Sequence, residues 1–199
     1  SRIPMTVRVG AVVEGHGEVR ALPILIRRIC ETHEVFDLHV EHPYRLPRTQ
    51  MLNEKLGGAV RMQRIRVGDN GVVLVLLDAD DDDPGEVRAR ITSILGREAE
   101  GTMVVAVAVR EYEAWFLAAI ESLRGHGGVS GDAVFDGEPE HPRDAKGVLA
   151  ARMTESYRET LHQARFSAVM DLAQARGRSP SFAAFEADLL AALARAGAT

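Results

Sequence analysis

The chain has 199 residues, of which 46% are hydrophobic and 27% are charged, and its net charge is −5. This composition is typical of a folded domain and excludes a disordered chain, a collagen-like repeat and a coiled coil. The longest apolar runs, at 72–77 and 103–109, are too short to cross a bilayer. No secretory signal is evident at the N-terminus, and the single cysteine, Cys30, permits no internal disulfide. We therefore expect a cytoplasmic protein without a membrane partner.

Apolar and β-branched runs predict strands at 6–13, 35–40, 71–77 and 102–109. Each run is followed by a segment with helical spacing, beginning near residue 17 and then at 49–65, 85–98 and 113–123. Strands that alternate with helices favour a parallel sheet, because parallel neighbours need a crossover connection. The sequence therefore predicts an α/β protein with a Rossmannoid parallel sheet of about four strands and helices on both faces.

The character of the sequence changes after residue 124. Residues 125–142 are rich in Gly, Asp, Pro and His and predict a long loop, and helical stretches follow near 142–153, 159–175 and 181–196. We expect residues 1–124 to form the α/β core, and residues 125–199 to pack on it as a loop and C-terminal helices within one structural domain. The apolar last helix offers a surface for a homodimer. Trp115, Phe116 and Cys30 are expected to lie in the core.

Acidic residues follow three of the four predicted strands. Glu14 follows the first, Asp78 and Asp80 the third, and Glu111 and Glu113 the fourth; Glu18 lies one helical turn beyond Glu14. The carboxyl ends of parallel strands meet at the edge where ligands bind, so these carboxylates should converge there. They would repel one another unless cations were present, and Mg²⁺ or Mn²⁺ takes carboxylate oxygens as ligands. Two such ions clamp the attacking and leaving oxygens in phosphodiester cleavage.

Several of these residues have a second interpretation. Asp81–Asp83, before Pro84, is equally typical of a solvated loop with a helix cap, and Glu14 could stabilise a helix N-terminus. Spacing does not decide between Glu111 and Glu113. A basic stripe in 43–67 could bind a phosphate backbone or form a solvated helix face; it comprises Arg45, Arg48, Lys55, Arg61, Arg64 and Arg66.

Two short motifs resemble those of Toprim domains. The string VVEGHGE at 12–18 is similar to the VEGxxE motif in the form seen in overcoming-lysogenization-defect (OLD) nucleases, and LDAD at 77–80 is similar to the Toprim DxD motif. The segments REYEAWFL (110–117), HPRDAKGVL (141–149) and SPSF (179–182) extend the resemblance over most of the chain, to a bacterial family of small Toprim-like proteins of unknown function.

The resemblance implies specific roles. Glu14, Asp78 and Asp80 would be the core metal ligands, Glu18 a ligand of a second ion, and Glu113 the acid that follows the fourth strand. Lys146 matches the lysine that OLD-type nucleases place near the scissile phosphate, so Glu14 and Lys146 are the candidate catalytic residues. An exposed helix lysine is the plain alternative for Lys146. The ATPase domain of full-length OLD proteins is absent from this sequence, which suggests an ATPase partner protein and an effector role in a defence system.

The sequence thus favours a nuclease or phosphoryl-transfer enzyme that acts on DNA or RNA with Mg²⁺ or Mn²⁺, in a site for two ions. A phosphoacceptor domain fits less well, because it needs Thr or Ser at the end of a later strand and Thr102 begins one. The remaining alternative is a non-catalytic Toprim-like module that binds metal, nucleic acid or a partner.

Overall fold

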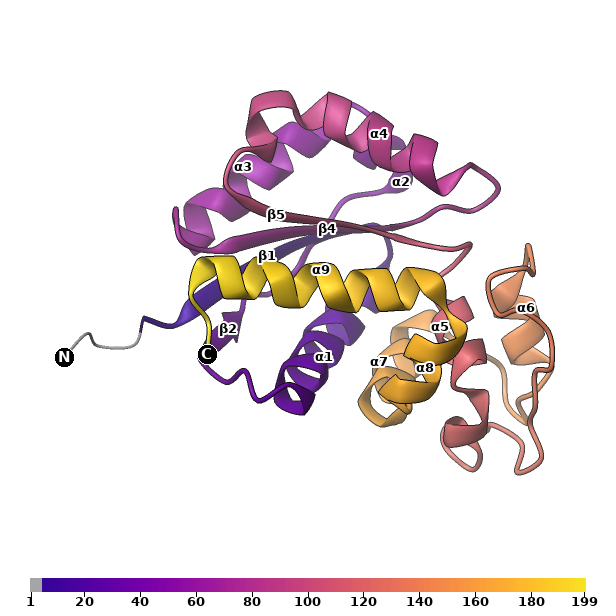
Figure 1. Cartoon of the computed structure of the whole chain (residues 1–199). Helices are drawn as coiled ribbons and strands as arrows, with labels where there is room; N and C mark the ends of the chain where they lie inside the picture. The colour runs from indigo at the N-terminus through magenta and orange to yellow at the C-terminus, as the bar shows by residue number, and fades with distance from the viewer. Residues whose placement is uncertain (1–4) are drawn as a thin grey trace.

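A parallel β-sheet forms the centre of the computed structural model, which describes residues 5–199 (Figure 1). Its strands are β1 (Val7–Val13), β2 (Leu38–Val40), β3 (Tyr44–Arg45), β4 (Val72–Asp78) and β5 (Thr102–Ala108). The order across the sheet is β2-β1-β4-β5, and β3 also pairs with β1, at Val12 and Val13. The α/β class and the parallel sheet predicted from the sequence are confirmed. The short strand β3 is an addition, since a pair of residues after Pro43 has no periodicity to detect.

Alternation along β4 explains why helices cover both faces of the sheet. Val72, Leu74 and Leu76 belong to one hydrophobic cluster, and Val73, Val75 and Leu77 belong to another. The first cluster includes the apolar sides of α1 (His16–Thr32) and α9 (Pro180–Ala196), and the second includes those of α3 (Lys55–Val67) and α4 (Pro84–Leu95). In Figure 1, α3 and α4 accordingly lie above the sheet, and α1 and α9 lie below it.

The remaining helices are α2 (Arg48–Met51), α5 (Glu113–Ala118), α6 (Ala145–Ala150), α7 (Glu159–Val169) and α8 (Leu172–Arg178), with 3-10 turns at Gly96–Ala99 and Ile120–Leu123. Two predicted helices are each divided in the structure. The helix expected over 49–65 is interrupted at Leu52, between α2 and α3. The helix expected over 159–175 ends at Val169, and Asp171 starts α8 by accepting a hydrogen bond from the backbone N–H of Gln174.

The C-terminal helices complete the main hydrophobic core. Phe182, Phe185 and Leu189 of α9 are buried in the same cluster as Trp115 and Phe116, which confirms the predicted core position of both aromatic residues. Cys30 is buried there too. The apolar face of α9 is therefore used within the chain, packed against β5. A homodimer through α9 stays a prediction. No helix among residues 5–199 is long and apolar enough to span a membrane.

The chain reverses its direction across the sheet between β1 and β4. From β1 it passes through α1 to β2 on one side, and it then returns through α3 to β4 on the other side. In open α/β sheets, the crevice at the carboxyl ends of two such strands is where ligands bind. Glu14 directly follows β1 and Asp78 ends β4, so these two acids flank this position.

Candidate metal and phosphate site

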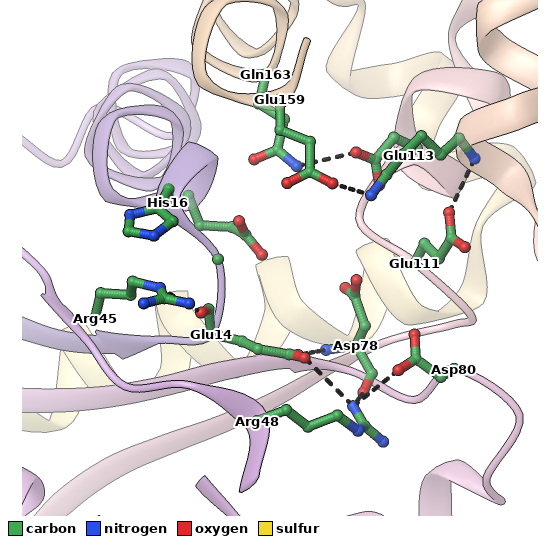
Figure 2. A pocket seen from close by; sticks show the side chains of 13 residues that line it. Glu14, His16, Arg45, Arg48, Asp78, Asp80, Glu111, Glu113, Glu159 and Gln163 are labelled. Atoms are coloured by element: carbon green, nitrogen blue, oxygen red, sulfur yellow. Dashed lines mark hydrogen bonds and ion pairs between the residues drawn. The ribbon is translucent and has the colours of Figure 1, made fainter. Parts of the chain in front are cut away.

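A cavity of about 360 Å³ opens at the carboxyl edge of the sheet (Figure 2). Two arginines and one lysine line it, Arg45, Arg48 and Lys146, together with His16. Seven carboxylic acids line it as well: Glu14, Glu18, Asp78, Asp80, Glu111, Glu113 and Glu159. Every site residue predicted from the sequence thus lies around one cavity, and Glu111 and Glu113, between which spacing did not decide, both line it.

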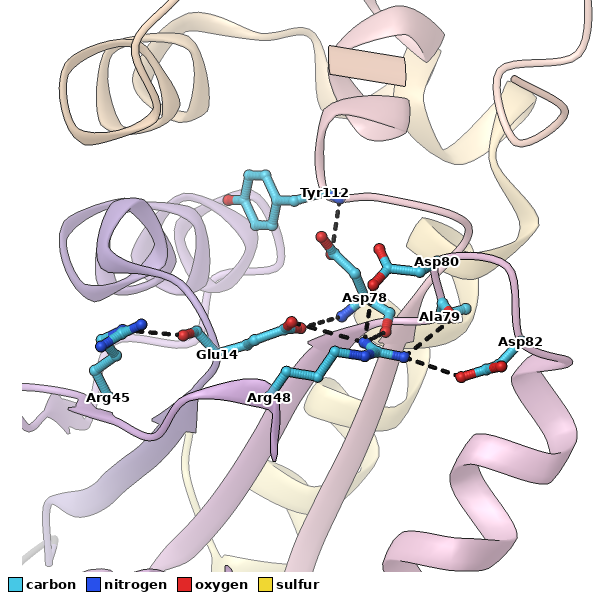
Figure 3. Close-up of polar contacts among 8 residues, drawn as sticks. All are labelled: Glu14, Arg45, Arg48, Asp78, Ala79, Asp80, Asp82 and Tyr112. Carbon is cyan, nitrogen blue, oxygen red and sulfur yellow. Dashed lines mark hydrogen bonds and ion pairs between the residues drawn. The ribbon is translucent and has the colours of Figure 1, made fainter. Parts of the chain in front are cut away.

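Glu14 and Asp78 are linked across the switch point. One carboxylate oxygen of Glu14, Oε2, accepts a hydrogen bond from the backbone N–H of Asp78 at 3.1 Å. Oδ1 of Asp78 in turn accepts from the backbone N–H of Tyr112 at 2.9 Å (Figure 3). Burial raises the pKa of Glu14, and burial together with Glu18 and Glu113 raises the pKa of Asp78 well above its usual range. Both carboxylates are therefore fixed in position where their negative charge is costly.

Arg48 lies between the acids on the more open side of the cavity (Figure 3). Its Nη1 is 3.2 Å from Oδ2 of Asp80 and 3.6 Å from Oε1 of Glu14, and it donates a 2.7 Å hydrogen bond to the carbonyl oxygen of Asp78. Its Nη2 is 3.2 Å from Asp82. Asp80 adopts a left-handed backbone conformation with φ of 52°, which Asp tolerates better than most residues. Sequence spacing placed Arg48 only in a basic stripe and gave no sign of this position.

Glu18 and Glu113 form the buried side of the cavity. Their residues are only 4% and 1% exposed, respectively. Oε1 of Glu113 accepts hydrogen bonds from the hydroxyl of Tyr157 at 2.6 Å and from Nε2 of Gln163 at 3.0 Å. Burial and the nearby carboxylates of Glu113 and Glu14 raise the pKa of Glu18 to about 7. Tyr157 and Gln163 were not predicted as site residues. The sequence indicates only that Tyr157 lies near the start of a helix and that Gln163 lies within it.

Lys146 lies on α6 beside the acids. Its backbone N–H donates to Oε2 of Glu111 at 2.9 Å, and its ammonium forms an ion pair with Glu159. Glu159 begins α7, where an acid has a sufficient explanation in the helix dipole, and the sequence gave no reason to place it in the site. Glu159 approaches the cavity because α7 packs closely on α1: a Cβ on Gly17 would lie 2.8 Å from the backbone oxygen of Glu159.

The donor set suits a hard cation in its chemistry. Carboxylate oxygens are the ligands that Mg²⁺ and Mn²⁺ prefer, and burial of several carboxylates favours an added positive charge. In the arrangement of residues 5–199, however, no three His, Cys, Asp or Glu side chains are grouped so that they could hold a metal ion. Arg48 stands between Glu14 and Asp80, where it neutralises part of the same charge. The ligand assignment therefore stays a prediction.

A family model described as a domain of unknown function, DUF4276, matches residues 13–190. The chain belongs to the DUF4276 family. The match includes every acid that lines the cavity, so the site lies within the part of the chain that defines DUF4276 membership. No curated protein and no solved structure matches the chain. The resemblance to Toprim and OLD nucleases accordingly stays a prediction.

Proposed function

We propose that the protein is a divalent-metal-dependent phosphodiester hydrolase that acts on nucleic acid. The observation that carries the proposal is the convergence of acids from three strand ends on one cavity at the switch point between β1 and β4. Acidic side chains without a binding role are mostly exposed to solvent, or each forms an ion pair with one basic side chain. Here Glu18 and Glu113 are buried beside Asp78. Burying three acids together destabilises the fold, and a bound positive charge would offset that cost.

Glu14, Asp78 and Asp80, with Glu18 and Glu113 on the buried side, are the residues that would hold Mg²⁺ or Mn²⁺, in a site for two ions. When bound, the ions would supply Lewis-acid stabilisation of phosphate oxygens and an activated water. The second residue to which we assign a catalytic role, beside Glu14, is Lys146. Its ammonium lines the same cavity and can stabilise negative charge that develops on a phosphate oxygen.

The chain's own hydrogen bonds prepare this arrangement. The backbone N–H groups of Asp78 and Tyr112 orient the carboxylates of Glu14 and Asp78, and Tyr157 and Gln163 orient Glu113. A carboxylate fixed in this way loses little conformational freedom when a cation binds. The support for the proposal is thus the preorganisation of the acids as well as their number.

A non-catalytic module is the second candidate function. It is favoured by the ion pairs that two basic side chains of the cavity already form, Arg48 with Asp80 and Lys146 with Glu159. A site neutralised in this way could bind nucleic acid, or an ATPase partner protein, without turnover.

The test is cleavage of plasmid DNA, single-stranded DNA and RNA by the purified protein with Mg²⁺, with Mn²⁺ and with a chelator. The variant is Asp80→Ala, and the matched control is Asp132→Ala, at an exposed loop acid outside the cavity. We expect metal-dependent cleavage that Asp80→Ala abolishes and Asp132→Ala retains. Binding of metal or nucleic acid without cleavage would favour the module, and the absence of both would overturn the proposed function.

A further inference from the structure

Of the two arginines and one lysine that line the cavity, only Arg45 lacks an acidic partner within the described residues 5–199. Arg48 pairs with Asp80 and Glu14, and Lys146 pairs with Glu159. Arg45 has no carboxylate within ion-pair distance in that part of the chain, although seven line the same cavity. The guanidinium of Arg45 does not neutralise any of these acids. It is therefore available to bind an anionic ligand.

The fold holds Arg45 beside Glu14. Arg45 is the second residue of β3 and pairs with Val13, the residue directly before Glu14. Its Nε donates a 3.2 Å hydrogen bond to the backbone oxygen of Glu14. Figure 3 shows Arg45 and Arg48 on opposite sides of Glu14. The hydrogen bond fixes the base of the guanidinium and leaves its two terminal amino groups for a ligand.

We propose that Arg45 binds a backbone phosphate of the nucleic-acid substrate, an inference that rests on the proposed function. A guanidinium matches two phosphate oxygens with two parallel N–H groups, which a lysine ammonium cannot do. A phosphate seated there would lie on the β3 side of Glu14, away from Glu159 and Glu113 (Figure 2). Arg45 is then a substrate-binding residue that sets the path of the strand across the site, whereas Lys146 serves the reacting phosphate.

Three other arginines of the basic stripe do not share this role. Arg61 pairs with Glu98, Arg64 donates to the backbone oxygens of Gly71 and Thr102, and Arg66 lies 3.7 Å from Glu41. These arginines are used in contacts within the chain. The structure thus divides the stripe that spacing alone left as one surface.

A purely structural role for Arg45 is the competing explanation, because its Nε also holds the backbone of Glu14. The two roles differ in salt dependence. On a single strand each phosphate contact adds about 0.7 to the slope of log K against log salt concentration, since a neutralised phosphate releases its counterion. A residue that only supports Glu14 would instead change the response to metal.

The experiment measures binding of fluorescein-labelled 20-nucleotide DNA and RNA strands by anisotropy, in Ca²⁺ and at several KCl concentrations. The variants are Arg45→Gln and Arg45→Lys, with Arg61→Gln as the matched control, and a Mg²⁺ thermal-shift measurement accompanies each. We expect Arg45→Gln to weaken binding about tenfold and to reduce the magnitude of the salt slope by about 0.7. Arg45→Lys should keep the slope and part of the affinity, and Arg61→Gln should match the wild type.

The Arg45 proposal would be overturned by wild-type affinity and slope in Arg45→Gln. It would also be overturned if weaker binding came with a lost Mg²⁺ shift, because Arg45 would then act only by supporting Glu14. Both results leave the proposed function standing, since the wild-type protein binds nucleic acid in each. If the wild type binds neither strand, the proposed function and the Arg45 proposal both fail.

Discussion

Nη1 of Arg48 lies 3.2 Å from Oδ2 of Asp80, between two acids that are predicted metal ligands. The same nitrogen lies 3.6 Å from Oε1 of Glu14 and donates to the carbonyl oxygen of Asp78. A divalent cation bound by Glu14 and Asp80 would repel this guanidinium. Arg48 and the metal are therefore expected to compete for the same negative charge.

Replacing Arg48 with methionine should separate the stabilising effect of Arg48 from that of the metal ion. Arg48→Met keeps the apolar stem but leaves Glu14 and Asp80 without their counter-charge, so the free energy of unfolding in chelator should fall by about 1–2 kcal/mol. The rise in melting temperature with millimolar Mg²⁺ should be larger than in the wild type, because the competing charge is gone.

The matched control is Arg61→Met, which breaks the exposed pair between Arg61 and Glu98 far from the cavity. It should change neither quantity by more than a small amount. A Mg²⁺ response that is smaller in Arg48→Met than in the wild type would mean that Arg48 helps to assemble the ligands.

Glu18 should make the metal-free protein less stable as the pH rises. In the folded protein its pKa is about 7, above the value of 4.5 expected in the unfolded chain, so the folded state binds the proton more tightly. The resulting stabilisation is fully present below about pH 4.5 and is lost as the pH rises to about 7. Integrated over that window it is about 3 kcal/mol.

Glu18→Gln removes the titration and should flatten this part of the profile. The measurement is urea unfolding in chelator at pH 5, 6, 7 and 8, with Glu100→Gln, at an exposed acid, as the control. Parallel profiles for the wild type and Glu18→Gln would show that the carboxyl of Glu18 is not shifted.

Asp78→Asn tests whether one residue both destabilises the metal-free protein by charge repulsion and binds the metal ion. Burial and the acidic neighbours of Asp78 oppose a negative charge on its carboxyl group and raise its pKa. Asparagine keeps an oxygen for the hydrogen bond from Tyr112. We expect a higher melting temperature than that of the wild type in chelator and a much smaller rise with Mg²⁺.

Asp80→Asn is the instructive comparison for Asp78→Asn. Its side chain is 48% exposed and it gives up the ion pair with Arg48, so the metal-free protein should gain little or no stability. A full Mg²⁺ response in Asp78→Asn would remove Asp78 from the set of ligands.

The strand ends were predictable because their signals are local. Buried parallel strands are continuous apolar runs, and an acid directly after such a run must lie at the carboxyl edge, which is how Glu14 and Asp78 were placed. The cavity's opposite wall was not predictable in this way. Glu159 and Gln163 reach it only because α7 packs on α1, a contact between segments that are more than 120 residues apart in the sequence. Arg48 was missed for the same reason, since its partners lie on another loop.

The close approach of α1 and α7 gives a stability prediction with an internal control. A Cβ on Gly17 would overlap Oε1 of Gln163 and lie 2.8 Å from the backbone oxygen of Glu159, so Gly17→Ala should destabilise the protein by about 1–3 kcal/mol. A Cβ on Gly58, inside α3, would meet no atom within 4 Å beyond its own turn of helix, and Gly58→Ala should stabilise the protein by about 0.5–1 kcal/mol.

Thermal unfolding of both variants in chelator checks these values. Equal melting temperatures for Gly17→Ala and the wild type would show that α7 can move away from α1 at little cost, and the wall formed by Glu159 would then be adjustable rather than fixed.

Lys146 gives the prediction that bears most directly on catalysis. If its ammonium stabilises charge on the reacting phosphate, Lys146→Ala should reduce the cleavage rate by about 10²–10³ while the Mg²⁺ thermal shift stays intact. Lys146→Arg should restore only part of the rate, because a planar fork replaces a compact ammonium.

The ion pair with Glu159 adds a further arm to this test. In the described structure the ammonium of Lys146 is held by Glu159, so substrate must share or displace that contact. Glu159→Gln weakens the pair without removing the lysine and should leave cleavage at or above the wild-type rate, measured under single-turnover conditions. If Lys146→Ala and Lys146→Arg both cleave at wild-type rates, the pair with Glu159 is structural, and the charge on the reacting phosphate is stabilised by other groups.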